Sequence, residues 1–212
     1  MKNISNAVVA LRQEIVRLAS APTFKHHRWY VKYHLCVVEK ISNELCDIYT
    51  QADRHLVTTL VWLHDCSKIT GSAPQIAAST CRNLLSRFGF DDSFIELAIR
   101  YVALIDQRSG IQDMPMEVQI VSSADGASHF TGPFYLFYWL ENPHRPYEEL
   151  LSENIAKMRV DYGSKITLPE VRNAFAARYG FVAEMLGDLP EKYLAHSNTR
   201  SFTKTAGSTN RK

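Results

Sequence analysis

Three residues suited to metal and phosphate chemistry lie close together at the end of an apolar stretch of this 212-residue chain. His64 and Asp65 are adjacent, and Lys68 follows three positions after Asp65. Neighbouring side chains on a helix diverge by roughly 100°, so His64 and Asp65 can reach one ion from two sides near a helix end. If the helix continues, Lys68 shares a face with Asp65. A pocket holding a nitrogen ligand, a carboxylate and a cation is suited to binding a divalent metal and a phosphate.

Two more residues complete a possible set of metal ligands. His34 precedes His64 within a stretch of helical periodicity, and Asp125 ends an apolar stretch further along the chain. We therefore predict that His34, His64, Asp65 and Asp125 bind one metal ion. Two imidazoles and two carboxylates suit Mn²⁺, Fe²⁺, Co²⁺, Ni²⁺ or Zn²⁺, with Mg²⁺ possible, better than Ca²⁺. A tetrahedral structural zinc is the alternative to an open catalytic site.

The order of these residues resembles that of the HD-domain superfamily of metal-dependent phosphohydrolases. The resemblance covers about residues 24–186, and its motifs are Leu63-His64-Asp65-x-x-Lys68, similar to the central motif of the family, and Ala124-Asp125, similar to its last ligand. It implies a helical fold in which a metal-activated water attacks a phosphate ester. Asp65 and Lys68 are then expected to act in catalysis, Lys68 by offsetting charge on the phosphoryl oxygens.

Histidines are missing from a part of the chain where many members of that family carry them. None lies between His64 and His129, and the binuclear members need extra histidines there. This absence favours a single metal and a small phosphomonoester, possibly a nucleotide, as the substrate. His129 shares a helical face with Asp125, and we place it with the catalytic residues, although a structural role is the alternative. Asp106 is either a further carboxylate of the pocket or a solvent-facing residue.

Two other classes of function compete with a phosphohydrolase. One is a non-catalytic domain that uses the same pocket to bind a nucleotide or a partner protein. The other is a helical oxygenase with a di-iron site, which would need the missing histidines. Three basic residues further along, Lys157, Arg159 and Lys165, are interpreted as a solvated face, with contact to a substrate phosphate as the alternative. The aromatic stretch 134–139 is interpreted as core, with the wall of a base-binding pocket as the alternative.

Composition limits the range of possible partners and compartments. The sequence is 46% hydrophobic and 22% charged with a net charge of +2, which is typical of a globular protein and predicts no nucleic-acid track. No apolar run is long enough to span a membrane. The four cysteines include no C-x-x-C pair, so we expect free thiols in a cytoplasmic protein. The natural substrate, the physiological metal and the oligomeric state are not predicted.

Hydrophobic periodicity predicts an all-α fold: one domain, residues 1–195, built as a bundle of about eight helices. The polar residues 196–212 have almost nothing to bury and are predicted to be disordered. The predicted helices nearest to the candidate ligands are Ala52 to Cys66, Met116 to Phe130 and Tyr147 to Tyr162. Asp53 and Asp91 are expected to cap helices, and Gly89 to end one.

Overall fold

The structure, a computed structural model, describes residues 4–107 and 109–187, without the side chains of Pro74 and Asp106. The predicted polar tail therefore lies outside the described residues. The α-helices are α1 (Ile4–Ala19), α2 (Cys36–Ile48), α3 (Arg54–Leu63), α4 (Cys66–Thr70), α5 (Pro74–Phe88), α6 (Asp92–Gln107), α7 (Met116–Ser128), α8 (Phe134–Leu140), α9 (Tyr147–Val160) and α10 (Pro169–Leu186). Between them lie the π-helical turns η1 (Val31–Leu35) and η3 (Asp161–Lys165) and the 3₁₀ turn η2 (Ile111–Asp113). The predicted all-α class is confirmed, since no strand occurs in these ranges.

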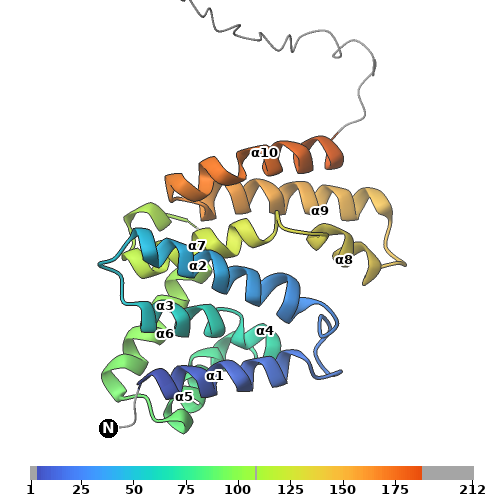
Figure 1. The fold of residues 1–212 in the computed structure, drawn as a ribbon. Coiled ribbons are helices and arrows are strands. Elements are labelled where there is room, and N and C mark those ends of the chain that lie inside the picture. Colours follow the sequence, from blue (N-terminus) through green and yellow to red (C-terminus); the bar gives the residue numbers. More distant parts are fainter. Residues whose placement is uncertain (1–3, 108, 188–212) are drawn as a thin grey trace, which may run out of the picture.

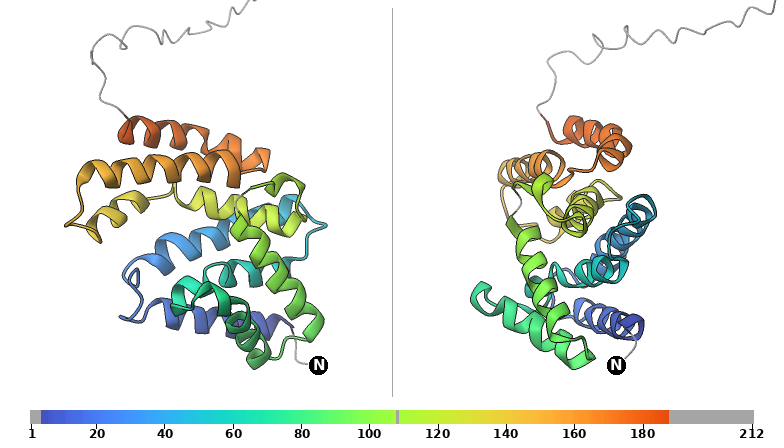
Figure 2. Two further views of the ribbon diagram at one scale, coloured as in Figure 1. Left: turned by 180° about the vertical axis from the view of Figure 1, so that it is seen from behind. Right: turned by 90° about the vertical axis from the view of Figure 1, so that its left-hand side faces the viewer.

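The helices stack in layers around α7 (Figure 1). Helices α9 and α10 form the layer at one end, and α1 and α5 lie at the other end, as the two turned views also show (Figure 2). Between these ends, α7 packs against α2, α3, α6, η3 and α10. None of the helices in the described ranges is both long and apolar enough to cross a membrane.

Helix α7 is buried along almost its whole length, and every residue from Ile120 to Ser128 is inaccessible to solvent or nearly so. A helix buried on all sides belongs to the core, and its polar side chains must find partners there. Ser122 and Ser123 do so by donating hydrogen bonds to the carbonyl oxygen of Lys165, at 3.2 and 3.4 Å. Thus α7 fixes the turn η3, which lies far from it in sequence.

Gly126 allows α7 and η3 to approach this closely. A Cβ atom at this position would lie 2.8 Å from the carbonyl oxygen of Asp161 and 3.1 Å from the Cβ of Lys165. A separation of 2.8 Å from backbone is too short for an ordinary contact, so a larger residue would push η3 away. The absence of a side chain at Gly126 therefore determines where Asp161 and Lys165 lie.

The predicted helix ends agree with the structure at several positions. Asp53 accepts hydrogen bonds from the backbone amides of His55 and Leu56, at 2.8 and 3.1 Å. Asp91 accepts one from Phe94 at 2.9 Å, and Gly89 ends α5 in the left-handed conformation, with φ of 84°. These capping interactions follow from local chemistry, which is why the sequence was sufficient to predict them.

Candidate metal centre

The four predicted ligands converge at the centre of the bundle. The Nε2 atoms of His34 and His64 are 3.3 Å apart, and Oδ2 of Asp65 lies 3.3 and 3.4 Å from them. Oδ1 of Asp125 lies 3.6 Å from Nε2 of His34 and 3.9 Å from Nε2 of His64. These atoms come from η1, from the α3–α4 junction and from α7, so the set depends on tertiary packing.

An interruption of the helix between α3 and α4 gives His64 and Asp65 their positions. The sequence predicted one helix from Ala52 to Cys66, and this is wrong: α3 ends at Leu63 and α4 begins at Cys66. Asp65 leaves the helical conformation, with φ of −110° and ψ of 18°. The two adjacent side chains therefore reach the same point, where a continuous helix would have separated them.

Hydrogen bonds assign the protons on two of the imidazoles. Nδ1 of His64 lies 2.8 Å from the carbonyl oxygen of Val61, which can only accept, so this nitrogen carries the proton. Nδ1 of His34 lies 2.9 Å from Oγ of Ser128. The Ser128 hydroxyl donates to the carbonyl of Asp125 at 2.7 Å, so it accepts from His34.

Both Nε2 atoms are consequently unprotonated and present lone pairs to one another. The 3.3 Å approach between them therefore contains no hydrogen atom and is not a hydrogen bond. Two lone pairs and two nearby carboxylate oxygens repel one another unless a cation lies between them. This arrangement is characteristic of metal-ligating histidines, whose other nitrogen donates to a carbonyl or similar acceptor.

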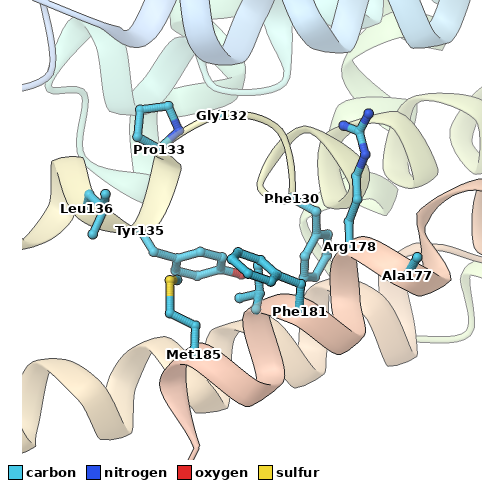
Figure 3. Close-up of a pocket in the computed structure, with 10 residues that line it drawn as sticks. Phe130, Gly132, Pro133, Tyr135, Leu136, Ala177, Arg178, Phe181 and Met185 are labelled. Atoms are coloured by element: carbon cyan, nitrogen blue, oxygen red, sulfur yellow. The ribbon is translucent and has the colours of Figure 1, made fainter. Parts of the chain in front are cut away.

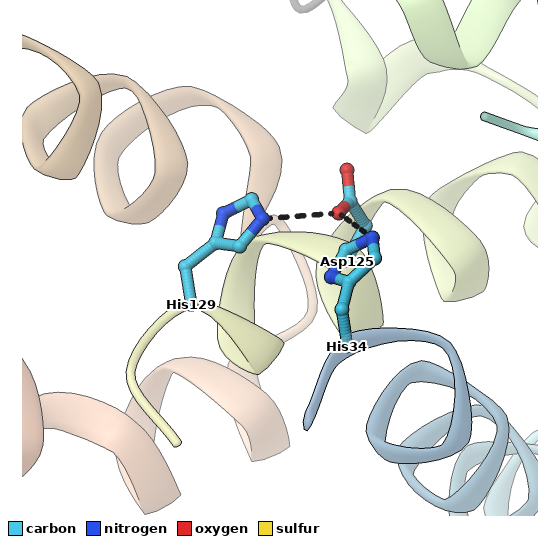
Figure 4. A group of neighbouring side chains, drawn as sticks. All are labelled: His34, Asp125 and His129. Carbon is cyan, nitrogen blue, oxygen red and sulfur yellow. Dashed lines mark ion pairs between the residues drawn. The ribbon is translucent and has the colours of Figure 1, made fainter. Parts of the chain in front are cut away.

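His129 adds a third imidazole to the group (Figure 4). Its Nε2 lies 3.5 Å from Oδ1 of Asp125, and its ring stacks on that of His34 with centroids 5.2 Å apart. Its Nδ1 lies 2.7 Å from Oδ2 of the buried Asp161, which places the proton on Nδ1. The Nε2 of His129 thus faces the cavity as an acceptor. Two overlapping sets, His34 with Asp125 and His129, and His34 with His64 and Asp65, are each compact enough to hold an ion.

Burial keeps these histidines neutral at neutral pH. Loss of solvent lowers the pKa of His64 to about 4 and lowers the pKa of His34 and of His129. The nearby carboxylates act in the opposite direction and do not offset burial. A neutral imidazole is the form that binds a metal, so the three side chains are held in that form by the fold.

Lysines complete the centre, and the predicted solvated face is wrong for one of them, Lys165. Lys165 does not lie on a solvated face, since it lines the cavity and is only 5% exposed, whereas Lys157 lines the cavity with 38% of its side chain still exposed. Arg159 is exposed as predicted. Burial lowers the pKa of the Lys165 amine, but Asp125 and Asp161 outweigh it and leave that pKa raised. Lys165 is paired with Oδ2 of Asp125, which leaves Oδ1 directed at the histidines.

Lys68 also lies at the cavity, next to Asp65. Its amine lies 2.8 Å from the Asp65 carboxylate and 3.3 Å from the hydroxyl of Tyr30. Tyr30 in turn donates a hydrogen bond to Oδ2 of Asp65. The phenol and the amine fix the orientation of this carboxylate. The ring of Phe134 closes another wall, with its centroid 4.0 Å from that of His129.

The separations that join His34 and His64 to each other and to the two carboxylates suit a divalent cation. Atoms bound to one ion at about 2.1 Å lie about 3.0–3.4 Å from one another, and the observed separations, from 3.3 to 3.9 Å, are at this range or slightly above it. The cavity they surround measures about 70 Å³. It has room for an ion and a small group, and it is too small for a large ligand.

Charge balance adds a second indication. The three lysines at the centre, Lys68, Lys157 and Lys165, are matched by three aspartates, Asp65, Asp125 and Asp161. A divalent ion alone would leave two positive charges in excess at the centre, although solvent screens part of this excess because the side chains of Lys68 and Lys157 are 49% and 38% exposed. An anion with two negative charges, such as a phosphate monoester, would restore the balance.

The structure brings together all the predicted site residues whose side chains it describes. His34, His64, Asp65, Lys68, Asp125 and His129 all line the one cavity. The side chain of Asp106 lies outside the described part, so its alternative role stays a prediction. Sequence reasoning missed Tyr30 and Asp161. A signal existed for Asp161: with Lys165 it continues the buried stripe of α9, Leu150, Asn154 and Met158, at three- and four-residue steps.

Known proteins provide no further guide to this centre. The chain matches no family model, no curated protein and no solved structure in the three comparisons made.

Proposed function

We propose that the protein is a metal-dependent phosphohydrolase that acts on a small phosphomonoester. The observation that carries the proposal is the convergence of unprotonated nitrogens and carboxylate oxygens from His34, His64, Asp65 and Asp125 beside three lysines. The resemblance of the ordered ligands to the HD-domain superfamily agrees with it.

Several residues of the metal centre have a defined role in the proposed reaction. A bound divalent ion would supply Lewis-acid chemistry, acidifying a water molecule and polarising the phosphoryl group. Lys68 and Lys157 would bind phosphoryl oxygens and offset the charge that grows on them. The Nε2 of His129 would accept a proton from the attacking water and pass it to the leaving oxygen of the ester, and Asp161 would stabilise the intervening imidazolium through Nδ1.

Lys165 has a positioning part. It is fully enclosed and pairs with Asp125, so it would keep Oδ2 occupied and present Oδ1 to the ion. Mn²⁺, Fe²⁺, Co²⁺, Ni²⁺ and Zn²⁺ suit the mixed nitrogen and oxygen donors. As the more specific substrate class we propose a nucleotide.

Metal analysis of the purified protein, combined with hydrolysis assays, tests this function. The assays would use a phosphomonoester, a phosphodiester and nucleotides under each of several divalent ions. We expect about one bound ion per chain and turnover of monoesters that chelation abolishes and metal restores. Metal binding with nucleotide binding but no turnover would instead indicate the non-catalytic alternative. A protein that binds no divalent ion would refute the proposal.

A further inference from the structure

A second chamber adjoins the metal centre and has the features of a binding site for the leaving group. It measures about 240 Å³, and four residues, Tyr30, Lys68, Phe134 and Lys157, line both chambers. The two spaces are thus adjacent, and these shared side chains lie between them. Together they reach the lower end of the volume range of ligand pockets, about 300 Å³.

The chamber combines flat apolar walls with a charged entrance. Trp29, Phe134 and Tyr138 contribute aromatic surface. Lys68 and Lys157 lie on the side facing the metal centre, where a phosphate group would be held. A ligand extending from the metal centre would therefore place its phosphate between the lysines and its remaining part between aromatic rings, an environment suited to a flat ring.

Most polar groups of the chamber already have partners. The indole nitrogen of Trp29 donates to Glu141 at 2.7 Å, and Nδ1 of His26 lies 2.6 Å from the same carboxylate. The hydroxyl of Tyr138 donates to Glu153 at 2.5 Å. These groups shape the chamber and do not need a ligand to satisfy them.

Asn154 differs from them. The residue is 3% exposed and lines the chamber, and its Nδ2, which is itself inaccessible to solvent, has no hydrogen-bond partner among the described residues. An unsatisfied buried donor destabilises a fold. A ligand in the chamber would supply the missing acceptor once the amide turns toward it, and sites of this kind discriminate strongly against ligands that lack the acceptor.

We infer that this chamber binds the leaving group of the substrate and that Asn154 is a specificity-determining residue. The inference rests on the proposed phosphohydrolase function. The chemistry selects a phosphomonoester whose leaving group carries a flat ring with a hydrogen-bond acceptor. The base of a nucleoside monophosphate meets this description, whereas phenyl phosphate has the ring without the acceptor and glycerol 3-phosphate has neither.

The test compares these three kinds of ester on the metal-loaded wild type and on Asn154→Leu. This variant removes the donor and keeps the branched shape of the side chain, but leucine is bulkier than asparagine, so the melting temperature is measured to detect overpacking. Asn154→Ala serves as a second variant. Asn43→Leu, at an exposed position of α2, is the control for the same chemical change away from the chamber.

We expect at least one nucleoside 5′-monophosphate of the four common bases to exceed phenyl phosphate in kcat/KM by about tenfold. Asn154→Leu should abolish that advantage, mainly through KM, and leave glycerol 3-phosphate unaffected. Equal losses on all three esters, or no preference for any nucleotide in the wild type, would overturn the inference.

A separate readout distinguishes failure of this inference from failure of the proposed function. If no ester is hydrolysed, the function is wrong, and the chamber is then tested by calorimetric titration of the same four monophosphates into Mn²⁺-loaded protein. Binding that Asn154→Leu weakens by about tenfold would support the chamber as a binding site. No binding, or binding that the variant leaves unchanged, would overturn it.

Discussion

Two hollows of this molecule differ in nearly every respect. The groove between α8 and α10 measures about 590 Å³, and its lining residues include a single charged one, Arg178 (Figure 3). Phe181 and Met185 stand on its α10 side, 67% and 44% exposed. The metal centre is a much smaller cavity, about 70 Å³, lined by three histidines, two carboxylates and three lysines.

This difference shows that the volume of a cavity does not indicate where the reactive groups of a protein lie. A large apolar hollow is the default candidate for a binding site, yet this groove holds no cluster of groups that could activate a substrate. The small cavity instead keeps ionised groups out of water, at a desolvation cost of several kcal/mol per ion. Packing alone does not require such an arrangement, and clustered groups with displaced pKa values mark functional sites.

The largest expected effect is at the Asp65 carboxylate. Asp65→Ala should lower metal content and reduce phosphomonoesterase activity by about a thousandfold or more, because metal chemistry contributes several kcal/mol to the transition state. Phe181→Ala, in the groove, is the control and should change neither. Metal analysis and steady-state kinetics measure both. Full metal content and activity in Asp65→Ala would show that the small cavity is not the functional site.

Removing the Asp125 carboxylate should have the largest effect on stability. Asp125→Ala leaves the buried Lys165 amine without its partner, which we expect to cost about 3–5 kcal/mol of unfolding free energy. Urea denaturation measures it. The double variant Asp125→Ala/Lys165→Met should recover much of the loss, because it removes the unpaired charge as well. A single variant as stable as the wild type would show that Lys165 is not enclosed as described.

The metal-free protein should lose stability in mild acid. The folded state holds the pKa of His64 near 4, below its ordinary value of 6.5. Between these values the unfolded state binds more protons, so stability is complete above about pH 6.5 and falls toward pH 4, by on the order of 3 kcal/mol. His64→Gln should reduce this dependence in urea denaturation at a series of pH values, while His34 and His129, whose pKa is also lowered, retain part of it. His55→Gln, at an exposed histidine, should keep it.

A smaller effect is expected at Lys68. Lys68→Ala should keep the metal content and lower kcat/KM on phosphomonoesters roughly ten- to a hundredfold, since one charge-assisted contact contributes about 1.5–3 kcal/mol. Lys40→Ala, on α2, controls for the loss of a lysine elsewhere. Kinetics unchanged on every phosphate ester would remove Lys68 from the phosphate site.

The sequence predicted the helices and the ligands better than it predicted how they meet. Caps such as Asp53 and Gly89 follow from local chemistry, and the order of His34, His64, Asp65 and Asp125 carried the site. The break between α3 and α4 was missed because Leu60 and Leu63 keep helical spacing up to it. The interruption is caused by tertiary packing, and helix propensity contains no information about tertiary packing.

The π-helical turns show the same limit. The turn η1, which carries His34, lies in a stretch of helical periodicity, and η3, which carries Asp161 and Lys165, extends α9 beyond Tyr162, where the predicted helix ended. Such turns often occur at functional sites, but no residue type in the sequence predicts where they form. The burial of Lys165 was missed because a lysine on a helix face is ordinarily solvated, and the close packing of α7 on η3 at Gly126, which helps to enclose it, is a tertiary feature.

A crystal structure of the protein soaked in Mn²⁺, with anomalous scattering used to locate the ion, tests the central claim most directly. We predict one ion at about 2.0–2.4 Å from Nε2 of His34, Nε2 of His64, one oxygen of Asp65 and Oδ1 of Asp125. An ion found elsewhere, or none at this position at saturating Mn²⁺, would contradict the account.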